Sequence, residues 1–328
     1  MLKKTILILE CSRIFSLPMS ILSWLVVYTY SIIDSGNVFY GLLALIGISF
    51  AHLGTNLLDD YFDYKSLIKQ VDFDKTEYLK NSQKTKCRYL INGLMKESQL
   101  FFMSGLYFAV AFLIGLFLYL KCGNGVLNFA MAGAIVALLY PFVSRICLSE
   151  VAVALAYGPI LFGGVYYVMC GTIANDIFIL SIPTMLMTVV LLYIHTVMDY
   201  DYDMAEGKKT IANCFDSQLD SLVLLKVLLI LAYIAPILLC MFDIADWQVF
   251  FVYLTIPMAR DLYKSMAEFA CDETSVPEKK WYHFPMENLA TFRERGEDAF
   301  MIRMFQSRNL MIYFSVLMTL GIILSLAI

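Results

Sequence analysis

Nine apolar runs, each close to 20 residues long, constrain the fold of this chain more than any other feature. A transmembrane helix needs about 20 mostly apolar residues, because the hydrocarbon core of a bilayer is about 30 Å thick and each helical residue rises about 1.5 Å. The runs lie at residues 15–33, 38–58, 99–120, 124–143, 148–170, 177–198, 219–241, 244–262 and 310–328. We therefore expect an all-α fold, a polytopic membrane bundle of nine transmembrane helices.

The composition argues against a soluble globular domain and against a nucleic-acid-binding protein. Hydrophobic residues make up 60% of the 328 residues and charged residues 16%, whereas a soluble domain carries about 25% charged residues. The net charge of −4 gives no basic surface for nucleic acid. The eight cysteines include no Cys-x-x-Cys pair, so they predict neither a disulfide framework nor a cysteine metal site. We expect a single transmembrane domain over residues 1–328, with the lipid bilayer and small molecules as its partners and no nucleic acid.

The positions of Lys and Arg predict the orientation of the chain. With a cytoplasmic N-terminus, the bases outside the expected spans fall on the cytoplasmic side, except Lys121, as the positive-inside rule requires. The long connections 59–98, 199–218 and 263–309 are then all cytoplasmic, and the C-terminus is outside. Loops of this length are usually functional or disordered, so we expect the active site on the cytoplasmic face, in the bacterial inner membrane.

Two acidic clusters follow two of the expected spans. The second span ends in Asn56-Leu57-Leu58-Asp59-Asp60-Tyr61-Phe62-Asp63, and the sixth ends in His195-Thr196-Val197-Met198-Asp199-Tyr200-Asp201-Tyr202-Asp203. Residues three or four apart share one face of a helix. We therefore expect one polar stripe of Asn56, Asp60 and Asp63, and a second of His195, Asp199 and Asp203.

Carboxylates at this spacing repel one another, so a cation should lie between them. Oxygen ligands favour Mg²⁺ or, as a second possibility, Mn²⁺. Because Mg²⁺ typically binds through one or two carboxylates together with water and substrate phosphates, the clusters indicate a phosphate-bearing substrate, most simply a diphosphate bridged by metal ions. Lys208 and Lys209, just after the second cluster, and Arg88, in the loop that follows the first, could neutralise its remaining charge.

The clusters also suggest an internal repeat. Asp60 and Asp199 each end the second span of a four-span unit, which predicts two parallel four-helix repeats followed by a ninth helix. Parallel repeats place both clusters on the same side of the membrane, as a one-sided active site requires. A transporter would instead be expected to have its site near the bilayer midplane.

At these residues the sequence resembles the UbiA superfamily of membrane prenyltransferases. The family's first motif, Asn-Asp-x-x-Asp-x-x-x-Asp, corresponds to Asp59-Asp60-Tyr61-Phe62-Asp63, with Asp59 in the place of Asn, Leu67 in the place of the last Asp, and Asp72 or Asp74 as possible substitutes. The second motif, Asp-x-x-x-Asp, corresponds to Asp199 and Asp203, although Met198 stands where the family usually has Arg and His195 where Asn is frequent.

Three further stretches resemble the 1,4-dihydroxy-2-naphthoate polyprenyltransferase branch of this family. They are Gly207-Lys208-Lys209-Thr210-Ile211-Ala212, Glu150 followed by Gly158-Pro159, and Arg88 before Gly93. The resemblance implies Mg²⁺-dependent transfer of a polyprenyl group from a prenyl diphosphate to an aromatic quinone precursor, in menaquinone or related quinone biosynthesis. It implies that Asp60, Asp63, Asp199 and Asp203 are the catalytic metal ligands. The substrate-binding residues are then Asn56, Asp59, Arg88, His195, Lys208 and Lys209.

Two other functions remain open at this point. Asp59-Asp60-x-x-Asp63 also matches the Asp-Asp-x-x-Asp motif of soluble terpenoid synthases, so a terpene cyclase on the membrane scaffold is one alternative. A secondary transporter is the other, and it would require charged residues at bilayer depth.

Overall fold

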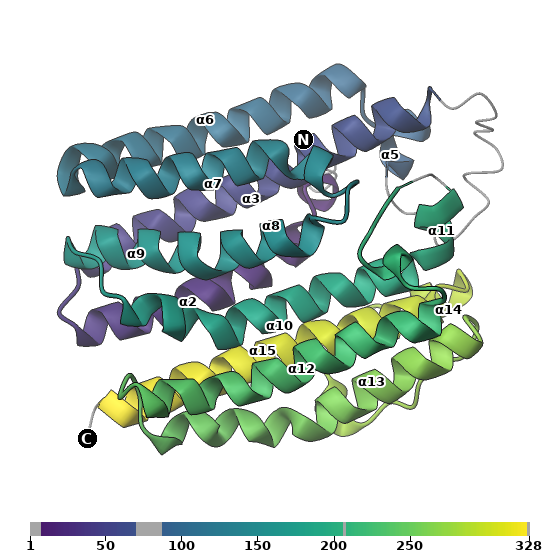
Figure 1. Cartoon of the computed structure of the whole chain (residues 1–328). Coiled ribbons are helices and arrows are strands. Elements are labelled where there is room, and N and C mark those ends of the chain that lie inside the picture. The colour runs from purple at the N-terminus through teal and green to yellow at the C-terminus, as the bar shows by residue number, and fades with distance from the viewer. Residues whose placement is uncertain (1–7, 70–86, 206–207, 327–328) are drawn as a thin grey trace.

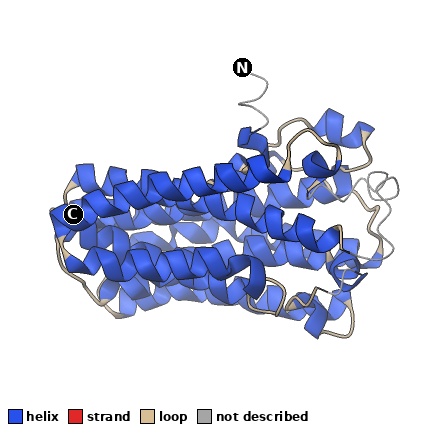
Figure 2. Ribbon diagram, turned by 90° about the horizontal axis from the view of Figure 1, so that it is seen from above, coloured by secondary structure: helices blue, strands red, loops and turns tan. Residues whose placement is uncertain are grey.

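The computed structural model describes residues 8–69, 87–205 and 208–326. Within these ranges the chain is helical and contains no strand, apart from one isolated bridge between Ile146 and Lys209. Figure 2 shows the helices lying roughly parallel to one another with short loops at the ends. The all-α prediction is confirmed.

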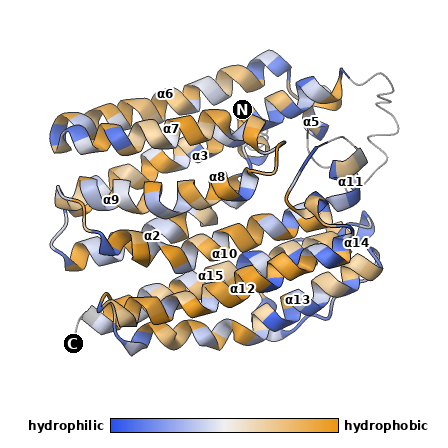
Figure 3. Ribbon diagram, in the orientation of Figure 1, coloured by the Kyte–Doolittle hydropathy of each residue, from blue (hydrophilic) through white to orange (hydrophobic). Residues whose placement is uncertain are grey.

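Eight helices in the described part of the chain are long and apolar enough to cross a membrane. Four come before residue 144 and four after it. They are η1 with α2 (Ile14–Ser16, Pro18–Ile33), α3 (Val38–Leu67), α6 (Glu97–Cys122), α7 (Asn124–Val143), α8 with η2 and α9 (Ser149–Leu155, Ala156–Ile160, Leu161–Cys170), α10 (Asp176–Met198), α12 (Gln218–Met241) and α15 (Asp298–Leu326). Figure 3 shows hydrophobic residues along the length of these helices and hydrophilic residues gathered near their ends.

The apolar run at 244–262 forms two shorter segments instead of one long α-helix. They are η4 (Trp247–Thr255), a 3-10 helix, and α13 (Ile256–Cys271). Pro257 stands in the first turn of α13, where it is tolerated because the first N–H groups of a helix have no intrahelical partner. The two segments follow one another and pack along α12 (Figure 1).

The connection expected at 263–309 is largely helical, which corrects that expectation. It contains the end of α13, the short helices η5 (Trp281–His283) and α14 (Leu289–Glu294), and the first turns of α15. Arg303 explains the order of this segment. Its fully buried guanidinium donates to the carbonyl oxygens of Ser265, Ser275 and Ala299 at 2.8 Å each, and so joins α13, the following loop and α15.

The helices differ in how deeply they are buried. The central helix is α10, most of whose residues are buried, whereas α7 has few buried residues and exposes large apolar side chains such as Leu138 and Phe142. One end of the bundle carries α5 (Arg88–Ile91), α11 (Tyr200–Ala205) and α14, and the C-terminus lies at the opposite end (Figure 1).

Candidate active site

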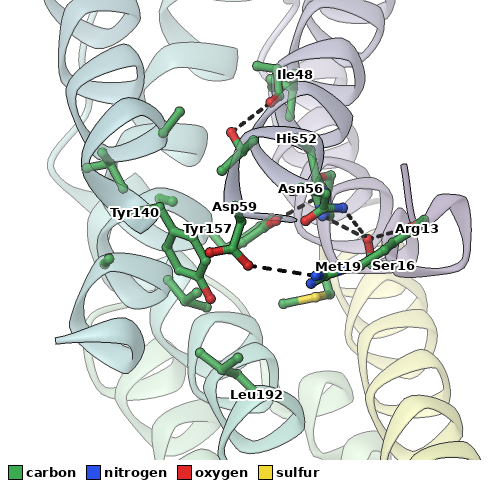
Figure 4. Close-up of a pocket in the computed structure, with 18 of the residues that line it drawn as sticks. Arg13, Ser16, Met19, Ile48, His52, Asn56, Asp59, Tyr140, Tyr157 and Leu192 are labelled. Carbon is green, nitrogen blue, oxygen red and sulfur yellow. Dashed lines mark hydrogen bonds and ion pairs between the residues drawn. The ribbon is translucent and has the colours of Figure 1, made fainter. Parts of the chain in front are cut away.

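A large cavity runs into the bundle from the end that carries α5, α11 and α14. Its volume is about 1640 Å³, and most of its wall is apolar, including Phe112, Leu127 and Phe129. Polar and charged side chains occupy other parts of the wall, some of which Figure 4 shows. The cavity therefore combines a hydrocarbon-like chamber with a charged region.

Seven of the predicted site residues line this cavity, and they come from both halves of the chain. They are Asn56, Asp59, Asp60, Arg88, His195, Asp203 and Lys208. Asp63, Asp199 and Lys209 are not part of its wall. The structure thus brings both acidic clusters to one cavity, although Asp63 and Asp199 are not on its wall.

The length of α3 places the first cluster. A helix of 30 residues is about 45 Å long, so α3 extends beyond a hydrocarbon core of about 30 Å. Asp59 and Asp60 lie in its last turns and are 3% and 2% exposed. Arg13, just before the first span, forms an ion pair with Asp60 and lies 3.7 Å from an oxygen of Asp59.

Tyr89 is a second partner of Asp60. Its hydroxyl donates a hydrogen bond to Asp60 Oδ2 at 2.8 Å, and α5 brings it there. Burial and the nearby Asp60 carboxylate raise the pKa of Tyr89 far above its usual range. Tyr89 therefore remains a hydrogen-bond donor at any physiological pH.

Asp63 faces away from the cavity toward the link between α7 and α8. Arg145 in this link donates to Asp63 Oδ1 at 2.7 Å and to the Phe62 carbonyl oxygen at 3.3 Å. The backbone of Lys209 bonds to the same link, through the Arg145 carbonyl oxygen at 3.3 Å and the Cys147 N–H at 2.9 Å. The loop that follows the second cluster is thereby held beside the first.

The second cluster does not form the continuous helical stripe expected from its spacing. The helix α10 ends at Met198, Asp199 has dihedral angles outside the helical range, and α11 begins at Tyr200. His195 and Asp199 are nevertheless in contact, as their four-residue spacing predicts, with His195 Nδ1 3.0 Å from an Asp199 oxygen. Asp203 is 3% exposed and lies 3.3 Å from the Lys208 ammonium on the cavity wall.

These side chains fit a magnesium site that a substrate completes. In the described part of the chain, no three acidic, histidine or cysteine side chains lie close enough to hold a metal ion by themselves. The donors on the cavity wall are carboxylate oxygens, which Mg²⁺ prefers, and Mg²⁺ usually fills its remaining positions with water and phosphate oxygens. Asp72 and Asp74, the possible substitutes in the first motif, lie outside the described residues.

Several residues on the cavity wall were not predicted from sequence. Arg13 and Tyr89 carry no motif, and only their charge or hydroxyl group and their nearness to the spans could have suggested them. The expected loop at 263–309 contributes a further wall, because Phe292 of α14, Arg295 just after it and Phe300 of α15 also line the cavity.

Comparison with known proteins identifies the fold. The model of the UbiA prenyltransferase family matches residues 16–288. A digeranylgeranylglyceryl phosphate synthase has 16% sequence identity to the chain and a TM-score of 0.57, over 98% of this chain and 99% of the synthase. A UbiA homologue from Aeropyrum pernix K1 has 15% identity and a TM-score of 0.57, over 93% and 97% of the two chains.

A UbiA homologue from Archaeoglobus fulgidus has 12% identity and a TM-score of 0.54, over 95% of this chain and 99% of the homologue. No curated protein sequence matches the chain. At these identities the structural likeness is one of fold, and the family model carries the assignment. Because that model covers most of the 328 residues, the chain belongs to the UbiA prenyltransferase family.

Proposed function

We propose that the protein transfers a polyprenyl group from a prenyl diphosphate to an aromatic acceptor in a Mg²⁺-dependent reaction. The observation that carries this proposal is that one cavity joins acidic residues from both halves of the chain to a long apolar chamber. A prenyl diphosphate has this same division, with a charged head and a hydrocarbon tail. Each CH₂ buried is worth about 0.8 kcal/mol, so the apolar wall favours binding of the tail.

Magnesium ions would be held by Asp60 and Asp203 on the cavity wall, together with Asp63 and Asp199 once these two turn from Arg145 and His195 toward the cavity. The structures of the Archaeoglobus fulgidus homologue with GPP and Mg²⁺ and with DMAPP and Mg²⁺ support this choice of metal and substrate. Bound Mg²⁺ would neutralise the diphosphate and so favour its departure as a leaving group.

The remaining polar residues of the cavity bind and orient the donor. Lys208 and Arg88, both on the cavity wall, supply further positive charge for the diphosphate. Arg13 and Tyr89 hold the Asp60 carboxylate in one orientation, with its two oxygens on different partners. The apolar wall keeps water from the allylic cation that forms when the C–O bond breaks and pyrophosphate leaves. The aromatic ring can then attack this cation and lose the proton of the attacked carbon to a site carboxylate or water.

The acceptor that the sequence favours is a quinone precursor such as 1,4-dihydroxy-2-naphthoate, which places the enzyme in menaquinone or related quinone biosynthesis. The stretch Lys208-Lys209-Thr210-Ile211-Ala212 supports this branch. Thr210 lines the cavity next to Lys208, and Lys209 fixes the stretch to the link after α7 through its backbone. Glu150, also typical of the branch, is buried and accepts hydrogen bonds from Ser149 and Thr196, both on the cavity wall.

We also propose nine membrane crossings in the bacterial inner membrane, with the N-terminus and the cavity mouth in the cytoplasm and the C-terminus outside. The segments η4 and α13 together add about 40 Å of helix alongside α12, enough for a crossing. In both halves the helix before the acidic cluster packs on the next long helix, α3 on α6 and α10 on α12, which supports the parallel four-helix repeat.

The test is an assay of the purified protein with geranyl diphosphate, 1,4-dihydroxy-2-naphthoate and Mg²⁺. We expect pyrophosphate release and a prenylated product by mass spectrometry, both abolished by EDTA and by Asp60→Asn or Asp199→Asn. Asp243→Asn is the matched control, because Asp243 is exposed, lies away from the cavity and has a positive φ that Asn tolerates.

Other outcomes would contradict the proposal in distinct ways. Pyrophosphate release with a cyclised terpene and no prenylated aromatic would indicate a terpene cyclase. Flux of an unaltered substrate into proteoliposomes, without pyrophosphate release, would indicate a transporter. Near-normal turnover in both cluster variants would refute the metal-binding role.

A further inference from the structure

A cluster of neutral polar side chains lies within the cavity at a greater depth than the carboxylates. Its centre is His52, on the same helix as Asp59 and Asp60 (Figure 4). The seven or eight residues that separate them correspond to about 10–12 Å along the helix. Met19 and Ile48 line the cavity near this depth, so the cluster is a polar spot in apolar surroundings.

The hydrogen bonds of Ser16 assign the tautomer of His52. The single hydroxyl hydrogen of Ser16 is donated to the Arg13 carbonyl oxygen at 2.8 Å, and Ser16 Oγ accepts from Asn56 Nδ2 at 3.1 Å. His52 Nε2, which lies 2.9 Å from the same oxygen, must therefore be a donor. In neutral imidazole the other nitrogen, Nδ1, is then an acceptor.

Two hydroxyl groups meet at this one acceptor nitrogen. The Ser20 hydroxyl lies 2.7 Å from His52 Nδ1, and the Tyr157 hydroxyl lies 3.1 Å from it. An imidazole nitrogen has one lone pair, so only one of the two can donate to it fully. Ser20 is closer and completely buried, whereas Tyr157 is partly exposed on the cavity wall. Ser20 also forms a hydrogen bond with the Tyr157 hydroxyl, so Ser20 and His52 hold this hydroxyl from one side while its other side lies on the cavity wall, open to a bound molecule.

We infer that the Tyr157 hydroxyl, held in place by Ser20 and His52, binds one neutral oxygen of the acceptor, either a phenolic hydroxyl or a carbonyl. This inference rests on the proposed function and specifies its acceptor. The donor cannot account for the cluster, because its charged head belongs with the carboxylates and its tail carries no oxygen. An aromatic acceptor of two fused rings has its reacting carbon near the diphosphate. Its opposite edge then extends toward the His52 cluster.

Tyr157 is on this basis a specificity-determining residue, and Ser20 and His52 are positioning residues. A site that hydrogen-bonds a substrate hydroxyl discriminates against the analogue that lacks it, because the buried polar group of the site is then left without a partner. The cluster joins α2, α3 and η2, so a purely structural role is the alternative. That role predicts a loss of stability but no change in preference between two acceptors.

The experiment compares two acceptor compounds that differ by one hydroxyl, 1,4-dihydroxynaphthalene and 1-naphthol, with geranyl diphosphate and Mg²⁺ and the full-length purified protein. In Tyr157→Phe we expect the preference for 1,4-dihydroxynaphthalene in kcat/KM to fall about three- to tenfold, the range of one neutral hydrogen bond. The KM for geranyl diphosphate and the unfolding temperature should stay at the wild-type values.

Ser20→Ala provides a second, independent variant. Without Ser20, the Tyr157 hydroxyl is free to donate to His52 Nδ1, so the preference should fall although Tyr157 is intact. Tyr119→Phe is the matched control, since it makes the same chemical change elsewhere on the cavity wall, and its preference should equal that of the wild type.

The outcomes separate this inference from the proposed function. An unchanged acceptor preference in Tyr157→Phe, with the wild type active on both compounds, overturns the subsite alone. An equal fall in Tyr119→Phe also overturns it, because the effect would then not be specific to the cluster. If the wild type prenylates no aromatic compound at all, the proposed function fails and the subsite fails with it.

Discussion

The ion pair between Arg13 and Asp60 allows a quantitative prediction about the empty and the metal-bound protein. Asp60 is 2% exposed, and Arg13 is its cationic partner in the structure. In Arg13→Met the carboxylate loses this cation, while the long unbranched side chain keeps much of the packing. Removing one partner of a buried ion pair costs about 3–5 kcal/mol. The Arg13 side chain is 25% exposed, so we expect the lower end, about 3 kcal/mol.

The assay is unfolding of the purified protein in detergent, by heat or by denaturant, with EDTA or with Mg²⁺ and pyrophosphate, which completes the metal site. In EDTA the free energy of unfolding of the Arg13→Met variant should be lower than that of the wild type by about 3 kcal/mol. If Asp60 binds Mg²⁺, the ion replaces the missing positive charge, and the stabilisation by Mg²⁺ should be larger in the variant than in the wild type.

Lys264→Met is the matched control for this prediction. Lys264 lies 3.7 Å from Glu268 in an exposed pair, and such pairs contribute about 0–1 kcal/mol. We expect little loss of stability and no altered response to Mg²⁺. Wild-type stability of Arg13→Met in EDTA would refute the buried ion pair, and an unaltered response to Mg²⁺ with pyrophosphate would refute metal binding at Asp60.

Three further predictions follow from single residues. Lys208→Ala should raise the KM for geranyl diphosphate about tenfold, the effect of losing one charge-assisted hydrogen bond, and an unchanged KM in a pyrophosphate-release assay would contradict its role. Gly321→Ala should lower stability by about 1–3 kcal/mol, because a Cβ at Gly321 would lie 2.6 Å from the Gln248 carbonyl oxygen, whereas Gly115→Ala, with open space around it, should not. Burial raises the pKa of the Cys147 thiol to about 11. Its rate of alkylation by iodoacetamide, followed by peptide mass spectrometry, should therefore still rise between pH 9 and pH 10. The rate for an ordinary thiol, with a pKa of about 8.5, has nearly levelled off in that range.

The apolar runs predicted most of the fold because, in a membrane, length and hydropathy nearly determine which segments become helices. The eight long helices coincide with eight of the nine runs. The run at 244–262 was harder to interpret, since its second part belongs to the amphipathic helix α13, whose charged residues Arg260, Asp261 and Lys264 a hydropathy count treats as a loop. The order of the 263–309 segment depends on tertiary hydrogen bonds to Arg303, which no local pattern reveals.

Only part of the site was predicted, because the prediction relied on helical spacing, which holds within a helix and not across its end. Helical spacing correctly placed Asn56 and Asp60 on the face of α3 toward the cavity, whereas Asp63, expected on the same stripe, faces Arg145. At the second cluster His195 and Asp199 are in contact, as their spacing predicts, but α10 ends at Met198 and Asp199 is not on the cavity wall with Asp203. Helix ends depend on local capping and on packing of the next segment, so a four-residue spacing that crosses an end does not guarantee a shared face.

The pairing of carboxylates with cations from other segments explains why the donor should bind together with its metal ions. Arg13 and Arg145 contact Asp60 and Asp63, and Lys208 contacts Asp203. These cations already offset the carboxylates, so a free diphosphate would bring several uncompensated negative charges into a region of low dielectric constant, where repulsion is strong. A diphosphate that carries Mg²⁺ brings little net charge, and the resident cations can remain with their carboxylates or shift toward phosphate oxygens. The carboxylates therefore repel a diphosphate without Mg²⁺ and favour binding of the diphosphate as its magnesium complex.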